Sequence, residues 1–156
     1  MKIKDLMKTP TFTVHPTDNL NQAVKVMWDK RIGALPVIDE DSRIVGMLTD
    51  RDACMAAYTK GRALSEISVD SAMARQVHSC SADDDVGSAL KSMRELGVRR
   101  LPVVDKRGHV EGILSVDDIA RVASARPSGN AVKAADVSAA LAELASRSGD
   151  TARASL

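Results

Sequence analysis

Two seven-residue stretches place a hydroxyl three residues before a carboxylate: GMLTDRD at 46–52 and GILSVDD at 112–118. The pairs are Thr49 with Asp52, and Ser115 with Asp118. An ionised carboxylate only accepts hydrogen bonds, so it can take both hydroxyl protons of a ribose cis-diol. If a helix begins at each hydroxyl, its free backbone N–H groups also attract an anion. The pattern therefore predicts a nucleotide-like ligand. It is equally typical of a helix capping box, and the two roles are compatible.

Both heptapeptides belong to a longer internal repeat. Residues 32–52 align with residues 98–118 at a constant offset of 66, and the register extends back without a gap to Met7 and Met73. Over these 46 aligned positions 12 residues are identical, including the triplet LPV and the glycine and last acid of each heptapeptide. We assign the recurring glycine, hydroxyl and acid to the predicted site. One copy cannot cover its own sheet, which favours two copies packed as one pseudo-twofold module.

Each copy predicts the element order β-α-β-β-α. Short strands are expected to end at Val14 and Cys80, and apolar residues at helical spacing predict first helices from Leu20 and Val86. The runs LPVID and RIVGMLT predict a hairpin, as do LPVVD and HVEGILS. A second helix then begins at each acidic cluster and ends near residue 58 or residue 125. The predicted fold class is therefore α+β.

Three regions follow from this pattern: repeat 1 over residues 1–62, repeat 2 over 63–126, and a tail over 127–156. We expect the tail to hold a linker at 127–130, a short helix from Val132 to Arg147 and a disordered end, GDTARASL. One apolar face marks that helix: Ala134, Val137, Leu141 and Leu144. The helix either packs back on the repeats, forms a frayed tail, stabilises a dimer or binds a partner.

The repeated LPV-[IV]-D strand and heptapeptide resemble a tandem pair of cystathionine-β-synthase (CBS) domains, the regulatory unit called a Bateman module. The resemblance covers residues 4–126 and is strongest to stand-alone bacterial pairs. It implies a flat module with clefts between the repeats, in which many members bind adenosine nucleotides. It also implies a homodimer, and a regulatory or energy-sensing role rather than catalysis.

An adenine ring needs an apolar slot with backbone groups for its edge. Residues around the two LPV strands are candidates: Ile32, Ala34, Leu35 and Pro36, and Val98, Arg100, Leu101 and Pro102. The alternative is strand core, which we expect for Leu35, Val37, Leu101 and Val103. The resemblance implies that the segments before the first helices line the same clefts, through Thr13, Val14 and His15 in one copy and Cys80 and Ser81 in the other.

The two copies differ in charge. Arg51 lies between the acids of the first heptapeptide, where the second has Asp117. A guanidinium beside a helix N-terminus favours phosphate and an extra carboxylate opposes it, so we predict that the Thr49–Asp52 site takes a phosphorylated ligand more readily. Arg99 and Arg100 either add positive charge to a cleft or lie at a solvated strand end.

The composition argues against several classes of function and location. Lysine and arginine total 22 against 21 acids, and there is one Phe, one Trp and one Tyr. This balance predicts no binding to nucleic acid or to a membrane surface. The opening MKIKDLMKTP has no apolar signal region and no stretch approaches membrane-spanning length. We therefore expect a cytoplasmic protein.

Other reactive residues make no pattern. The three histidines lack zinc spacing, and His78 with Cys80 makes only a weak metal pair, so no metal is predicted. Cys54 falls in a predicted helix and is expected to be a buried structural thiol. Met7, Met27, Met73 and Met93 recur in register and are expected in the core. No catalytic motif is present, so no enzyme activity is expected.

The leading hypothesis is a sensor that binds an adenosine nucleotide (AMP, ADP or ATP) and signals to a protein partner in trans. The alternative is a dimeric CBS-fold scaffold or stress protein without a nucleotide ligand.

Overall fold

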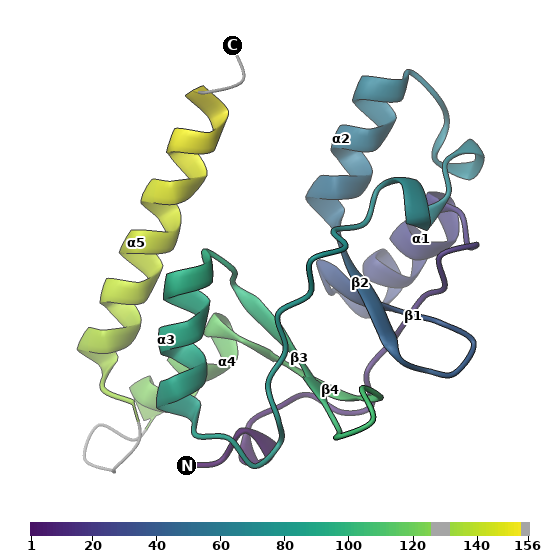
Figure 1. Ribbon diagram of the computed structural model, residues 1–156. Coiled ribbons are helices and arrows are strands. Elements are labelled where there is room, and N and C mark those ends of the chain that lie inside the picture. Colours follow the sequence, from purple (N-terminus) through teal and green to yellow (C-terminus); the bar gives the residue numbers. More distant parts are fainter. Residues whose placement is uncertain (126–131, 154–156) are drawn as a thin grey trace. The chain divides into compact units, whose positions relative to one another are not determined.

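The structure, a computed structural model, describes residues 1–125 and 132–153 (Figure 1). Side chains are described as far as residue 147. Its fold class is α+β, as predicted. The chain divides into two compact units that do not follow the order of the repeats. The α1–α2 unit comprises residues 10–78 and 104–110, and the α3–α5 unit comprises residues 1–9, 79–103 and 111–156.

The α1–α2 unit is built around a hairpin and two helices. Its elements are α1 (Leu20–Lys30), β1 (Ala34–Ile38), β2 (Ile44–Thr49) and α2 (Asp50–Lys60), followed by two 3-10 turns, Leu64–Glu66 and Val69–Ser71. The strands pair antiparallel, with Ala34 opposite Thr49. Val14 forms a parallel bridge to Val37, and Ala74 forms an antiparallel bridge to Met47. The predicted hairpin and both helices are confirmed.

Asn19 begins α1 through a capping box with Gln22, which satisfies backbone N–H groups that the first helical turn leaves open. Gly61 ends α2 in the left-handed conformation that glycine adopts readily. These local signals explain why the helices begin and end where the sequence predicts.

The α3–α5 unit repeats this plan and adds one helix. Its elements are a 3-10 turn (Ile3–Asp5), α3 (Val86–Leu96), β3 (Arg100–Val104), β4 (Val110–Ser115), α4 (Val116–Ala125) and α5 (Ala134–Arg153). β3 and β4 form a two-stranded sheet. Cys80 bridges Val103 in parallel, and Lys8 bridges Ile113 in antiparallel. The segment from the start of the chain thus lies beside the strand of the second repeat.

Each unit has its own aliphatic core. Leu35, Val37 and Leu48 are fully buried in one unit, and Leu101, Val103 and Leu114 are their equivalents in the other. The strand-core role predicted for the LPV residues is therefore confirmed. The recurring methionines also lie in these cores, with Met7 only partly buried.

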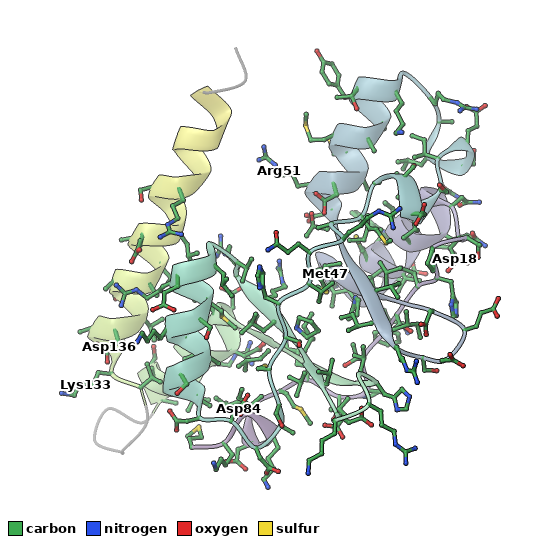
Figure 2. All side chains as sticks on the ribbon, in the orientation of Figure 1. Asp18, Met47, Arg51, Asp84, Lys133 and Asp136 are labelled. Carbon is green, nitrogen blue, oxygen red and sulfur yellow. The ribbon has the colours of Figure 1, made fainter. Side chains whose placement is uncertain are left out.

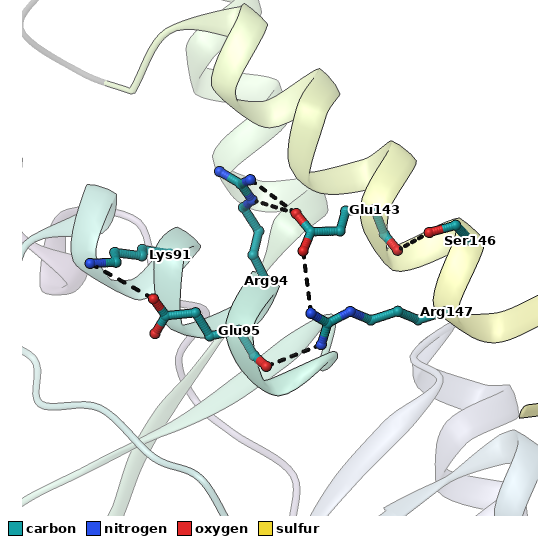
Figure 3. A network of polar contacts seen from close by, with 6 residues as sticks. All are labelled: Lys91, Arg94, Glu95, Glu143, Ser146 and Arg147. Carbon is teal, nitrogen blue, oxygen red and sulfur yellow. Dashed lines mark hydrogen bonds and ion pairs between the residues drawn. The ribbon is translucent and has the colours of Figure 1, made fainter. Parts of the chain in front are cut away.

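α5 packs back on its own unit, against α3 and α4. Val137, Ala140 and Leu144 of α5 are buried in the core of the α3–α5 unit. Glu143 receives two hydrogen bonds from Arg94 of α3, at 3.0 and 2.9 Å, and Arg147 donates to the Glu95 carbonyl at 3.1 Å (Figure 3). Of the roles predicted for this helix, the structure shows packing on the chain itself.

Three predictions on elements are wrong in part. Cys54 is exposed on α2 rather than buried. The short strands expected before the first helices are reduced to the single bridges at Val14 and Cys80. The backbone of α5 continues past Arg147 to Arg153, so part of the end expected to be disordered is helical. The linker predicted at 127–130 lies outside the described residues.

Candidate functional site

Thr49 caps α2 in the way the heptapeptide predicts. Its backbone is extended, and its Oγ1 accepts a hydrogen bond from the Asp52 N–H at 3.1 Å. In return Asp52 Oδ2 accepts from the Thr49 N–H at 2.9 Å and from the Thr49 hydroxyl at 2.7 Å. This is a complete capping box. It uses one of the two carboxylate oxygens of Asp52.

Ser115 and Asp118 repeat the same contacts at α4. Asp118 Oδ2 accepts from the Ser115 N–H at 3.2 Å and from its hydroxyl, and the Asp118 N–H donates to Ser115 Oγ at 3.2 Å. The capping interpretation of the motif is thus confirmed in both copies.

The second carboxylate oxygen distinguishes the copies. Asp118 Oδ1 lies 3.2 Å from Lys8 Nζ and 3.1 Å from a guanidinium nitrogen of Arg121, and the Asp118 side chain is 3% exposed. Asp52 is partly exposed, and its Oδ1 makes no hydrogen bond or ion pair among residues 1–125 and 132–147. Of the two motif aspartates, Asp52 therefore keeps one carboxylate oxygen that no group of the described residues engages.

The pKa of Asp118 reflects these contacts. Burial opposes its ionisation, but the hydrogen bond from Ser115 and the ammonium of Lys8 outweigh burial and hold the pKa of Asp118 below its ordinary value. The carboxylate is therefore ionised at neutral pH and compensated by cations of its own unit.

The recurring glycines, which the sequence analysis assigns to the site, have a packing role. A Cβ on Gly46 would lie 2.5 Å from Met73 Sδ and 3.1 Å from the Ala74 carbonyl oxygen. A Cβ on Gly112 would lie 2.8 Å from Met7 Sδ and 3.1 Å from the Lys8 carbonyl oxygen. Each glycine therefore lets a neighbouring segment approach its strand closely.

Arg51 and its counterpart Asp117 have different surroundings. Arg51 is exposed and projects from the first turn of α2 (Figure 2), and its guanidinium makes no hydrogen bond or ion pair within the part of the chain that the structure describes. Asp117 lies 3.6 Å from Arg99, and both side chains are more than half exposed. Because Arg99 offsets the extra acid, the charge contrast between the copies is smaller than the sequence suggests.

The predicted adenine-lining residues are buried to different extents. Ala34, Leu35, Pro36, Leu101 and Pro102 are buried, whereas Ile32, Val98 and Arg100 are partly exposed. Since Leu35 and Leu101 lie in the cores, only their backbone groups are available to a ligand. The Pro36 and Pro102 carbonyls already accept from the Val14 and Cys80 N–H groups, both at 3.1 Å.

The segments before α1 and α3 lie beside these strands. Thr13 is partly exposed and Val14 is buried. His15 is exposed, and its Nδ1 lies 3.1 Å from the Ile38 carbonyl oxygen. Ser81 is exposed, and its N–H donates to Asp84. Burial, and then the charge of Asp84, raise the pKa of the Cys80 thiol to about 11, so this thiol stays protonated at neutral pH.

Lys8 and Arg121, which the sequence analysis does not single out, both form ion pairs with Asp118. The repeat alignment carried a signal for both, since they stand opposite Ala74 and Met55 at the same offset of 66. What the alignment could not show is that both cations converge on Asp118.

Other features of the described residues lie away from the motif. A hollow of about 400 Å³ in the α3–α5 unit is lined by residues of α3 and α5 such as Leu90, Arg94 and Asp136, and by none of the predicted site residues. Among the described residues, no cluster of three metal-ligating side chains occurs and no helix is long and apolar enough to cross a membrane.

Taken with this geometry, comparison with known proteins identifies the class of protein. The fold is that of a repeated α+β module with a hydroxyl–carboxylate cap in each copy. The family model for the CBS domain matches residues 3–58 and 65–125, so the chain belongs to the CBS domain family and carries two copies of the domain.

Relatives and solved structures agree with this assignment. The chain is 33% identical over 118 residues to the CBS domain-containing protein YhcV of Bacillus subtilis, covering 76% of this chain and 82% of that protein. A CBS domain pair of protein MJ0100, solved with 5′-methylthioadenosine and S-adenosyl-L-methionine, is 27% identical with a TM-score of 0.73, covering 81% of this chain and 98% of that one. The structure of CBSX2 in complex with AMP is 25% identical with a TM-score of 0.69, covering 80% and 96%.

Some relatives are much longer. The chain spans 23% of the L-aspartate semialdehyde sulfurtransferase of Methanocaldococcus jannaschii, to which it is 29% identical over 120 residues. The match to this enzyme is therefore confined to a part the size of a CBS pair.

Proposed function

We propose that this chain is a regulatory module that binds an adenosine nucleotide (AMP, ADP or ATP) at its hydroxyl–carboxylate motifs and signals to a protein partner in trans. The observation that carries the proposal is the Thr49–Asp52 pair at the start of α2. Its capping box uses Oδ2 of Asp52 and leaves Oδ1 to accept from a ribose hydroxyl.

The groups around this pair suit the rest of a nucleotide. Arg51 brings to the N-terminal turn of α2 a guanidinium that makes no hydrogen bond or ion pair among the described residues and can contact a phosphate. Ile32, which precedes β1 and is partly exposed, offers an apolar surface for the base close to the cap, since Ala34 of β1 pairs with Thr49. Related CBS pairs solved with adenosine-containing ligands support the same ligand class.

A thermal-shift panel of AMP, ADP, ATP, NAD and S-adenosylmethionine tests the proposal. A ligand at about a hundred times its Kd stabilises the folded state by about 2.7 kcal/mol, which raises Tm by roughly 5–10 °C for a chain of this size. We expect Asp52→Ala to abolish the shift and Asp50→Ala, its exposed neighbour, to retain it. No shift with any compound would favour the alternative, a scaffold without a nucleotide.

The role of Arg51 needs a matched pair of ligands. Arg51→Ala is expected to weaken AMP binding and to leave adenosine binding unchanged, because only AMP carries the phosphate. Equal loss for both ligands in isothermal titration would contradict a phosphate contact.

We further propose a homodimer formed through α1 and α2, in a cytoplasmic protein. Trp28 and Tyr58 on these helices are 83% and 81% exposed, which is unusual for large aromatic side chains. The position equivalent to Trp28 is Arg94, which pairs with α5. We expect Trp28→Glu/Tyr58→Glu to sediment as a monomer and the control Leu96→Glu to remain dimeric. A monomeric wild type would contradict this proposal.

A further inference from the structure

The aspartates of the two motif copies, Asp52 and Asp118, make the same contacts through one carboxylate oxygen. Their contacts through the other carboxylate oxygen differ. Oδ2 of each aspartate is bound by the capping hydroxyl and N–H. Oδ1 of Asp118 faces the ammonium of Lys8 and the guanidinium of Arg121, whereas Oδ1 of Asp52 faces no cation among the described residues. The acceptor that a ribose needs is therefore occupied in one copy alone.

The position of Lys8 is fixed by backbone pairing. Lys8 and Ile113 of β4 exchange both backbone hydrogen bonds, at 2.9 and 3.3 Å. In the other unit Ala74 and Met47 of β2 exchange the same two bonds, both at 2.9 Å. The two segments thus occupy equivalent places beside their strands, and what differs is a lysine in one and an alanine in the other.

Arg121 adds a second cation from the next turn of α4. It lies three residues after Asp118, a spacing at which helical side chains contact each other. Met55 occupies the equivalent position on α2 and carries no charge. Both differences act in the same direction, since each adds a positive charge at Asp118 and none at Asp52.

A ribose hydroxyl is a neutral donor and would have to displace charge-assisted contacts from a nearly fully buried carboxylate. Contacts between charged groups are roughly twice as strong as neutral hydrogen bonds. We propose that Lys8 and Arg121 close the Ser115–Asp118 motif to ribose, so that the chain binds one adenosine nucleotide, at Thr49–Asp52. Lys8 is then a specificity-determining residue that occupies the carboxylate in place of a ligand. This inference rests on the proposed function.

The repeat itself supplies the matched variants. In Lys8→Ala/Arg121→Met the two positions beside Asp118 carry the residues that occupy the equivalent positions in the first copy. In Ala74→Lys/Met55→Arg those positions of the first copy carry the residues of the second. Isothermal titration with AMP should show one site per chain for wild type, two for Lys8→Ala/Arg121→Met, and one again when Asp118→Ala is added. Ala74→Lys/Met55→Arg should weaken the wild-type site roughly tenfold or more, the effect of losing a hydrogen bond to a charged group.

Hydrogen exchange locates the site independently of stoichiometry. In wild type, AMP should slow exchange at the start of α2 and leave the start of α4 unchanged; in Lys8→Ala/Arg121→Met it should slow both. Exchange without ligand shows that each variant is folded.

The outcomes separate this inference from the proposed function. No binding of AMP by wild type or by any variant overturns the proposed function and this inference with it. Two sites in wild type, one of them lost in Asp118→Ala, overturn this inference alone. One AMP site in wild type and still only one in Lys8→Ala/Arg121→Met would also overturn this inference. In that case Lys8 and Arg121 would not be the residues that close the second motif.

Discussion

The α1–α2 and α3–α5 units derive from one repeat, yet they leave different groups open. In the α3–α5 unit Asp118 is compensated by Lys8 and Arg121, and Asp117 lies beside Arg99. In the α1–α2 unit the corresponding positions provide no cation to Asp52. The carboxylate that the α3–α5 unit engages with its own cations thus remains available to a ligand in the α1–α2 unit.

The helices show the same contrast. Leu90 of α3 and Ala123 of α4 are buried in the cluster that α5 completes, whereas the equivalent Val24 and Ala57 are only partly buried. A duplicated unit can therefore specialise without changing its fold: one copy becomes self-contained and the other keeps exposed groups for binding.

The largest expected effect tests the role of α5. Leu144→Ala removes a side chain that is 4% exposed and should reduce the free energy of unfolding by about 2–5 kcal/mol. Urea denaturation measures the loss, and hydrogen exchange should place it in the α3–α5 unit. Ser138→Ala, on the exposed side of α5, is the control. Equal loss of protection in both units would show that the units are not independent in stability.

The next largest effect tests what the two units share. Gly46→Ala and Gly112→Ala each place a Cβ within about 3 Å of a methionine sulfur and of a carbonyl oxygen. Overpacking of this kind costs about 1–3 kcal/mol. Both variants should lower the urea midpoint, by similar amounts. An unchanged urea midpoint for Gly46→Ala would contradict the packing role that we assign to this glycine.

A smaller effect tests the difference between the aspartates. Asp118→Asn removes the charge that faces Lys8 and Arg121; because both cations are more than half exposed, we expect a loss of about 1–2 kcal/mol. Asp52→Asn should cost less, since no cation of the described residues forms an ion pair with Asp52. Urea denaturation at neutral pH compares the two. A larger loss for Asp52→Asn would break the proposed contrast.

Lowering the pH should reduce the contribution of Asp118 to the free energy of unfolding. The folded-state pKa of Asp118 lies below its ordinary value, so the stability it contributes is present above the unfolded value of about 3.9 and is lost as pH falls through the folded value. The urea midpoint of wild type should therefore decrease when the pH is lowered below about 4. Asp118→Asn should show a shallower decline, and an identical decline would argue against a lowered pKa.

The smallest effect is expected at the α3–α5 contact. Glu143→Gln weakens the hydrogen bonds from Arg94, but both side chains are more than a third exposed, so solvent and salt screen the pair. We expect the smallest decrease in Tm of the series, and a difference from wild type that narrows at high salt. A decrease as large as that of Leu144→Ala would show that this pair, rather than apolar packing, holds α5.

Much of the fold could be predicted because its signals are local. Helical spacing in residues 20–30 and 86–96, the turns after the LPV strands, and the Thr49–Asp52 spacing all act over a few residues, and the repeat doubled each signal. Cys54 was placed wrongly because α2 exposes the face that carries it, and a short helix does not reveal from its sequence which neighbours cover it.

By itself the sequence determined the repeat, the two capping boxes, the aliphatic strand cores and the CBS family, because these depend on residue type and short spacing. Tertiary structure alone decided that Lys8 lies against Asp118, more than a hundred residues later in the chain, and that α5 covers α3 and α4. It also decided that the glycine of each heptapeptide accommodates a neighbouring segment. The reason is physical: these contacts depend on the register in which distant segments pair, and that register is set only when the whole unit packs.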